Sequence, residues 1–268
     1  RLYMMMTAVQ CLGGVPVPLY QDAVGAEMLF VLQDAGVRFA LAEDQEQVDK
    51  LLEIREQLPA LEHIVYDDPR GMRHYTQPFI HDIEELMAMG RIHNQNHPDF
   101  LDGEIELGKP DDVSVMLYTS GTTGKPKGVC QTHNAFIASG RGGCEFDRLT
   151  DDDDILSYLP MAWVGDHLFS FAQALVAGFT INCPESGDTV MTDLREIGPT
   201  YYFAPPRVFE NLLTQVMIRM EDAGALKQKM FHYFMAVARR CGADILDGKS
   251  VGLGDRLLYV LGNLLVYG

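Results

Sequence analysis

The chain has 268 residues, of which 47% are hydrophobic, and its formal net charge at pH 7 is −17. This length and apolar content suffice for a sizeable core, in one large domain or two smaller ones. The acidic balance argues against nucleic acid as a partner, because phosphate backbones are bound by clustered lysine and arginine.

Helical and strand signals alternate along the first part of the chain, which predicts an α/β fold. We expect helices over residues 2–12, 26–34 and 44–57, and strands over residues 15–19, 38–42 and 63–66. The connections between them are short, and a regular alternation of helix and strand favours a parallel sheet.

Residues 67–110 interrupt this alternation and are interpreted as a surface excursion. A helix is expected over residues 83–90, followed by a polar loop over residues 93–108. His93 and His97 stand four residues apart, a spacing that suits a metal site on a helix. Their polar neighbours favour a solvated pair in a loop instead, since a zinc site would need further ligands nearby.

A dense run of glycine, serine and threonine, closed by two lysines, occupies residues 118–128 and reads YTSGTTGKPKG. It follows an apolar segment, residues 113–117, that we expect to be a buried strand. Such a loop can turn backbone N–H groups and hydroxyls toward one centre, and a triphosphate is the obvious anion to bind there. A Walker A motif is excluded, because Gly124 and Lys125 are followed by Pro126. A flexible linker is the alternative, but a linker needs neither the lysines nor a preceding buried strand.

A second alternation of helix and strand follows this loop. Thr132 is the expected N-cap of a helix that starts at Asn134. The acidic run at residues 151–154 is interpreted as a solvated turn and not as a cation site. Further helices are expected over residues 167–177, 192–197, 207–223 and 226–240, and strands over residues 155–159, 179–183 and 201–204.

These two alternations predict two α/β subdomains. The first, residues 1–150, carries the loop at residues 117–128, and the second covers residues 151–268. The chain opens inside an expected helix and stops inside an apolar segment, residues 257–267. Natural termini seldom expose a core element in this way, so we expect a fragment of a longer protein.

The cysteines point to a reducing compartment. Their number is odd and they include no C-x-x-C pair, being Cys11, Cys130, Cys144, Cys183 and Cys241. Neither a disulfide framework nor a structural zinc site is expected, and the cytoplasm is the natural location. No signal peptide is recognised, and no apolar run reaches the roughly 18 residues of a membrane span.

Residues 117–127 resemble the signature loop of the adenylate-forming enzymes, which include acyl-CoA synthetases, luciferases and peptide-synthetase adenylation domains. Residues 128–134 continue in the manner typical of that family. Two later segments, residues 158–163 (YLPMAW) and 199–210, are similar to the long-chain acyl-CoA synthetase branch. The resemblance covers essentially the whole chain. It implies the layered α/β subdomains, with largely parallel sheets, of the family's large N-terminal domain.

The resemblance also implies a reaction and roles for particular residues. ATP activates a long-chain fatty acid to acyl-AMP, and CoA then takes the acyl group, with Mg²⁺ on the phosphates. The residues expected to hold the β- and γ-phosphates are Thr119, Ser120, Gly121, Thr122, Thr123 and Gly124. Thr122 would also meet Mg²⁺, and Lys127 would be the charged arm on the phosphates, whereas position 125 varies in the signature. Trp163 is a candidate for the acyl channel, with a core tryptophan as the equal alternative.

Two histidines near these segments are interpreted as structural. His133 would serve helix entry, although contact with substrate is the alternative, and His167 would be a satisfied core residue on an apolar helix. The family's adenine and ribose motifs and its C-terminal lid domain with a catalytic lysine are absent from these residues. We therefore expect no adenylating activity from this chain alone.

Two other functions remain open from the sequence. One is adenylation of another carboxylic acid, such as an amino or aryl acid, and the other is a non-catalytic nucleotide-binding relative. Small molecules are the expected partners, and the oligomeric state is not readable from the sequence. The resemblance leaves room for peripheral contact with a membrane, since long-chain acids partition into bilayers, but no basic amphipathic helix supports it.

Overall fold

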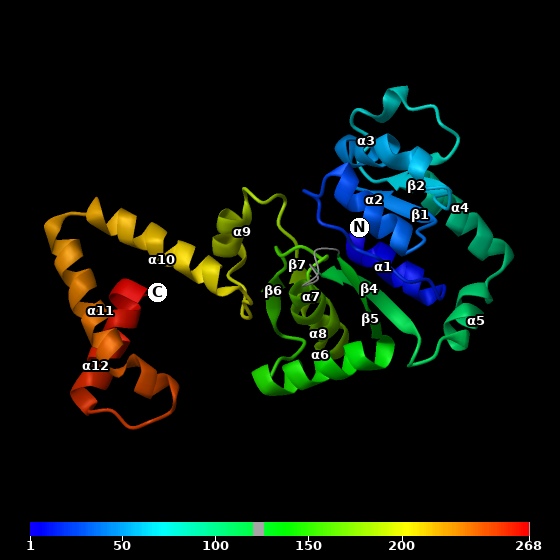
Figure 1. The fold of residues 1–268 in the computed structure, drawn as a ribbon. Helices are drawn as coiled ribbons and strands as arrows, with labels where there is room; N and C mark the ends of the chain where they lie inside the picture. The colour runs from blue at the N-terminus through cyan, green and yellow to red at the C-terminus, as the bar shows by residue number, and fades with distance from the viewer. Residues whose placement is uncertain (120–125, 268) are drawn as a thin grey trace. The chain divides into compact units, whose positions relative to one another are not determined.

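The computed structural model describes residues 1–119 and 126–267. The chain divides into two compact units, Arg1–Tyr202 and Phe203–Gly268. The expected α/β class is confirmed, because helices alternate with small and mostly parallel sheets (Figure 1). The predicted division after residue 150 lies inside the first unit and stays a prediction.

A three-stranded parallel sheet with the order β1-β2-β3 organises the first part of unit 1. Its strands are β1 (Phe39–Ala42), β2 (His63–Tyr66) and β3 (Ile80–Asp82). The preceding and intervening helices are α1 (Leu2–Cys11), α2 (Gly25–Asp34), α3 (Gln45–Ile54), η1 (Arg55–Gln57) and η2 (Met72–His74). Helix α3 begins where the Asp44 carboxylate accepts a hydrogen bond from the backbone N–H of Gln47 at 3.1 Å. Val48 and Leu51, one helical turn apart, then enter the core beside Ile64 of β2.

Two expectations for this part are wrong. Residues 14–20 form no strand, because their prolines cannot donate to a ladder. The segment instead runs beside the next sheet, where the Pro16 carbonyl accepts a hydrogen bond from the Met116 N–H at 3.1 Å. The polar stretch at 93–108 is largely helical, since α4 (Ile83–Asn96) continues through it and α5 (Phe100–Leu107) follows. Polar composition alone does not prevent a helix from forming.

An antiparallel hairpin holds the central loop of the chain. Its strands are β4 (Val113–Thr119) and β5 (Lys127–Thr132). The prediction of a strand before the loop is confirmed, and β4 buries Val115 and Leu117. The second strand was not predicted, because β5 is mostly exposed and lacks an alternating apolar pattern. Helix α6 (His133–Asp147) follows directly. As expected, Thr132 is its N-cap, and the Thr132 hydroxyl accepts a hydrogen bond from the Ala135 N–H at 3.2 Å.

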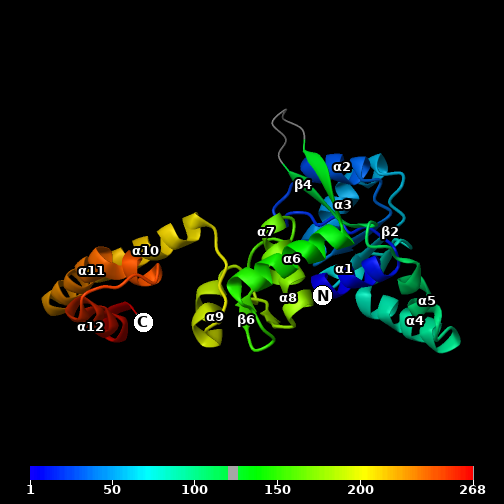
Figure 2. The ribbon, with the colours of Figure 1, turned by 90° about the horizontal axis from the view of Figure 1, so that it is seen from below.

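The rest of unit 1 is built around a two-stranded parallel sheet. Its strands are β6 (Asp154–Leu156) and β7 (Thr180–Asn182), joined by α7 (Val164–Asp166), the π-helical segment η3 (His167–Ala172) and α8 (Gln173–Ala177), and followed by α9 (Val190–Ile197). The strand expected at 201–204 is reduced to one bridge between Tyr201 and Ile155. Both views show α6 alongside α8 (Figures 1 and 2).

Unit 2 is entirely helical within its described residues. It contains α10 (Pro206–Glu221), α11 (Ala225–Leu246), α12 (Leu253–Gly262) and the π-helical η4 (Asn263–Tyr267). Helix α11 supplies the buried residues Phe231, Phe234 and Val237, and α12 is tied to it by an ion pair between Arg240 and Asp255. Among the described residues, no helix is both long and apolar enough to span a membrane.

Candidate functional site

The expected phosphate loop lies at the open end of the β4–β5 hairpin. Thr119, the last residue of β4, is the direct cross-strand partner of Lys127, the first residue of β5. Both side chains are exposed, and Lys127 takes part in no salt bridge among the described residues. A hydroxyl and an exposed ammonium group therefore flank the two ends of the loop. The remaining predicted phosphate and magnesium ligands lie outside the described residues: Ser120, Gly121, Thr122, Thr123 and Gly124.

Several contacts from other elements hold the base of this hairpin. The Gln10 side chain of α1 donates to the carbonyl of Ser114 at 2.8 Å, and the Tyr118 hydroxyl donates to Asp34 at 2.6 Å. Burial and the neighbouring Asp34 carboxylate raise the pKa of Tyr118, so this hydroxyl remains a donor. Gly128 is the cross-strand partner of Tyr118, and a β-carbon there would lie 2.9 Å from the Met116 sulfur and 3.1 Å from the Tyr118 ring, so the hairpin packs closely at this point. The hairpin is thus anchored to α1 and α2.

Trp163 lies at the start of the helical segment that joins β6 to β7. It is the N-cap of α7 and is half-buried. Its ring covers Gly165 so closely that a β-carbon there would overlap with the indole. Met161, two residues earlier, belongs to the same buried cluster as Leu117 of β4. The segment that carries Trp163 and the strand that precedes the phosphate loop therefore share one core. Trp163 as an acyl-channel residue stays a prediction.

A buried carboxyl group follows Trp163 by three residues and was not singled out from the sequence. Asp166 is 1% exposed. The hydroxyls of Ser157 and Ser170 each donate to its Oδ1 at 2.9 Å, and the Tyr3 hydroxyl lies 2.8 Å from Oδ2. No salt bridge among the described residues includes Asp166. Burial raises the pKa of this carboxyl, although the three hydroxyls oppose the rise.

His167, the next residue, is confirmed as a core histidine, but it is only partly satisfied, because its buried Nε2 has no hydrogen-bond partner among the described residues. Its side chain is fully buried, and Nδ1 lies 3.0 Å from the carbonyl oxygen of Met161. The ring meets Phe136 edge-on at a centroid distance of 5.5 Å. Burial lowers the pKa of His167, which keeps the imidazole neutral. In that state Nδ1–H donates to the Met161 carbonyl and fixes the turn before Trp163.

The other polar candidates occupy structural positions. The backbone N–H of His133 donates to the Asp112 carbonyl at 3.1 Å, at the entry to α6. Asp153 ends a turn by accepting from the Thr150 N–H and the Thr200 hydroxyl, each at 2.8 Å. The rings of His93 and His97 lie 4.8 Å apart. No group of three or more potential metal ligands occurs among the described residues.

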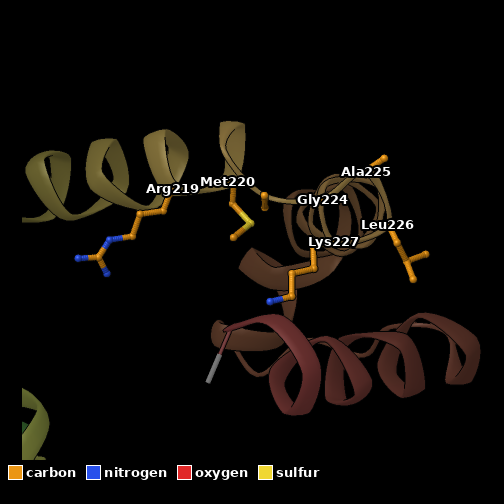
Figure 3. A pocket seen from close by; sticks show the side chains of 7 residues that line it. Arg219, Met220, Gly224, Ala225, Leu226 and Lys227 are labelled. Atoms are coloured by element: carbon orange, nitrogen blue, oxygen red, sulfur yellow. The ribbon is translucent and has the colours of Figure 1, made fainter.

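A separate cavity lies within unit 2, at the turn between α10 and α11 (Figure 3). It has a volume of about 580 Å³ and is lined by Arg219, Met220, Ala223, Gly224, Ala225, Leu226 and Lys227. None of the predicted site residues lines it. The candidate site therefore rests on the hairpin and on the Trp163 segment, both in unit 1.

The chain matches the family described as "AMP-binding enzyme" over residues 1–254. The long-chain-fatty-acid–CoA ligase ACSBG1 of Bos taurus is 28% identical over 259 residues, which cover 92% of this chain and 35% of that protein. The peroxisomal long chain acyl-CoA synthetase 6 of Arabidopsis thaliana is 31% identical over 157 residues, 56% of this chain and 21% of that protein.

A solved structure shows the same fold. The long-chain-fatty-acid-CoA ligase FadD1 from Archaeoglobus fulgidus superposes with a TM-score of 0.58 and 17% identity, over 82% of this chain and 40% of that one. At this identity the likeness concerns the fold alone. The chain spans about a third of the length of the bovine relative. Since the family match covers nearly all of the sequence, the chain belongs to the AMP-binding enzyme family.

Proposed function

We propose that this chain carries the phosphate-binding loop and part of the acyl-binding surface of an enzyme that activates long-chain fatty acids with ATP. The observation that supports it is the hairpin register, which places Thr119 opposite Lys127 at the two ends of the signature loop. In the proposed reaction the fatty-acid carboxylate attacks the α-phosphate of ATP and pyrophosphate leaves. The thiol of CoA then displaces AMP from the acyl-AMP.

The chemistry makes a clear electrostatic demand on the loop. Two anions must meet, so their repulsion has to be offset by positive charge and backbone donors. Lys127 is an exposed cation with no acidic partner among the described residues, in a chain of net charge −17. We assign it to the β- and γ-phosphates together with Thr119 to Gly124. Mg²⁺ at Thr122, CoA as acceptor and a cytoplasmic location with peripheral membrane contact belong to the same proposal.

The loop assignment is tested by phosphate binding to the purified chain. Inorganic tripolyphosphate is a better probe than ATP, because it needs no adenine or ribose contacts. We expect it to bind the wild type, and Lys127→Ala to weaken binding about tenfold or more, as loss of a charge-assisted contact does. Lys109→Ala is the matched control, since Lys109 is also exposed but precedes the opposite end of β4. Equal affinities for the two variants would contradict the assignment.

The acyl substrate is tested separately. Trp163 is the single tryptophan of the chain, so its fluorescence reports on this position alone. Palmitate should change its emission in a saturable way, whereas benzoate and free amino acids should not. A response to benzoate alone would favour adenylation of another carboxylic acid. Tripolyphosphate binding without any response to carboxylates would favour a non-catalytic nucleotide-binding relative.

A further inference from the structure

The Asp166 cluster contains one more short oxygen–oxygen contact than its hydroxyl groups can satisfy. Asp166 Oδ1 contacts Ser157 and Ser170, and Oδ2 contacts Tyr3. In addition, the Tyr3 and Ser157 hydroxyl oxygens lie only 2.5 Å apart. Each of these four contacts needs one proton to be attractive. The three hydroxyls supply three protons, so an ionised carboxylate would leave one contact between two bare oxygens.

A protonated carboxyl supplies the missing proton. Its Oδ2–H then donates to Tyr3, the Tyr3 hydroxyl donates to Ser157, and the Ser157 hydroxyl donates to Oδ1 of Asp166. These three bonds close a ring in which every donor and acceptor is used once, and Ser170 adds a fourth bond to Oδ1. The proton count rests on the positions of the oxygen atoms alone.

The surroundings agree with a neutral group. Asp166 is 1% exposed and has no ion-pair partner in the described part of the chain. The titratable groups around it include Tyr3 on α1, Cys183 after β7 and the adjacent His167. Burial raises the pKa values of Tyr3 and Cys183 and lowers that of His167. All three are therefore neutral near pH 7 and offer no positive charge to an ionised Asp166.

The ring joins three elements at the point where the Trp163 segment begins. Tyr3 comes from α1, Ser157 directly follows β6, and Asp166 ends the short helix α7 whose N-cap is Trp163. The indole in turn covers Gly165, the neighbour of Asp166. The carboxyl group and the tryptophan thus lie within one helical turn of each other.

We propose that Asp166 is a positioning residue that acts as a neutral carboxylic acid, and that its ring of hydroxyls sets how Trp163 is presented to an acyl chain. The acyl part of this inference rests on the proposed function. The protonation part does not depend on it.

Infrared spectroscopy tests the protonation. At neutral pH the difference spectrum between the wild type and Asp166→Asn should contain the carbonyl stretch of a protonated carboxylic acid. Asp68→Asn is the control, because hydrogen bonds from Arg70 lower the pKa of the Asp68 carboxyl, and its difference spectrum should contain ionised carboxylate bands instead. Carboxylate bands in the Asp166→Asn difference would overturn the proposal.

Trp163 fluorescence tests the positioning. Asp166→Asn keeps one donor and one acceptor in the ring, so its emission and palmitate titration should match the wild type within about twofold. Asp166→Ala should bind palmitate about tenfold more weakly, the size expected when one buried hydrogen-bonding group is lost. Tyr3→Phe breaks the same ring of hydrogen bonds and keeps the carboxyl group, so it replaces Asp166→Ala in the titration if that variant does not fold. The positioning role would be refuted if Asp166→Asn weakened palmitate binding as much as Asp166→Ala does. It would also be refuted if Tyr3→Phe left the palmitate titration unchanged.

A failure of the proposed function is recognisable in the same data. If palmitate leaves Trp163 emission unchanged in the wild type, the acyl-channel assignment is wrong. The infrared band and the shift of Trp163 emission in the ring variants then still decide between a neutral and an ionised Asp166.

Discussion

Two glycines of α6 provide a matched test of how tightly this helix packs against η3. Gly140 is buried, and a β-carbon there would lie 3.0 Å from the backbone carbonyl carbon and oxygen of Ala172. Gly142 is exposed on the same helix, and a β-carbon there would meet nothing within 4 Å. We therefore expect Gly142→Ala to stabilise the protein and Gly140→Ala to leave its stability unchanged or to lower it.

The magnitude follows from two opposing effects. Replacing glycine by alanine inside a helix raises the free energy of unfolding by about 0.8–1 kcal/mol at either position. At Gly140 the added methyl group presses on backbone that cannot rotate away, and such overpacking costs about 1–3 kcal/mol. Gly142→Ala should thus be stabilised by about 1 kcal/mol. Gly140→Ala should range from unchanged to about 2 kcal/mol less stable than the wild type.

Urea unfolding followed by Trp163 emission measures both variants in unit 1, which contains α6 and the single tryptophan. The difference between the two variants isolates the overpacking, because the helix propensity cancels. With a slope of about 2–3 kcal/mol per M, the two midpoints should differ by about 0.3–1.5 M. Equal stabilisation by both substitutions would refute the close approach of α6 to η3.

Three further outcomes are expected. Asp44→Ala should lower the free energy of unfolding by about 1 kcal/mol in urea, because α3 loses its N-cap. Tyr118→Phe should lower it by about 1 kcal/mol, because the 2.6 Å hydrogen bond to Asp34 is lost, and a double-mutant cycle with Asp34→Ala should show coupling. Burial raises the pKa of Asp166, so its contribution to stability is complete below about pH 3.9 and is lost as pH rises through the raised value. The stability of Asp166→Asn relative to wild type should therefore increase between pH 4 and 8, and a constant difference would contradict the raised pKa.

The predictions that were confirmed rest on short, local sequence patterns. The strand at residues 63–66 was predicted with its observed bounds, because it is a short apolar run between turn residues. Thr132 was identified as a cap because a hydroxyl before a helix has one favoured use. The strand before the phosphate loop was predicted from the apolar run at residues 113–117, which directly precedes the signature.

The failures concern features that sequence neighbours do not determine. Strand β5 exists because it pairs with β4, and its own residues are mostly exposed. The ring around Asp166 needs Tyr3, which is 163 residues away in the chain. The available signal was an acidic residue inside the apolar stretch that follows β6. Such a residue indicates a buried group that is hydrogen-bonded, but it does not identify the hydrogen-bond partners.

The π-helical turn η3 makes this part of unit 1 unusually sensitive to chain length. An α-helix places residues about 100° apart around its axis, and a wider π turn accommodates one residue more. Removing one residue from His167–Ala172 would tighten this wide turn to an α-helical one, and the residues inside the turn would change direction relative to Asp166. Ser170 and Phe171 would then leave the carboxyl group and the core, respectively. Single-residue deletions that a surface loop would absorb should therefore be selected against here, and natural variants should preserve the length of this segment more strictly than its side chains.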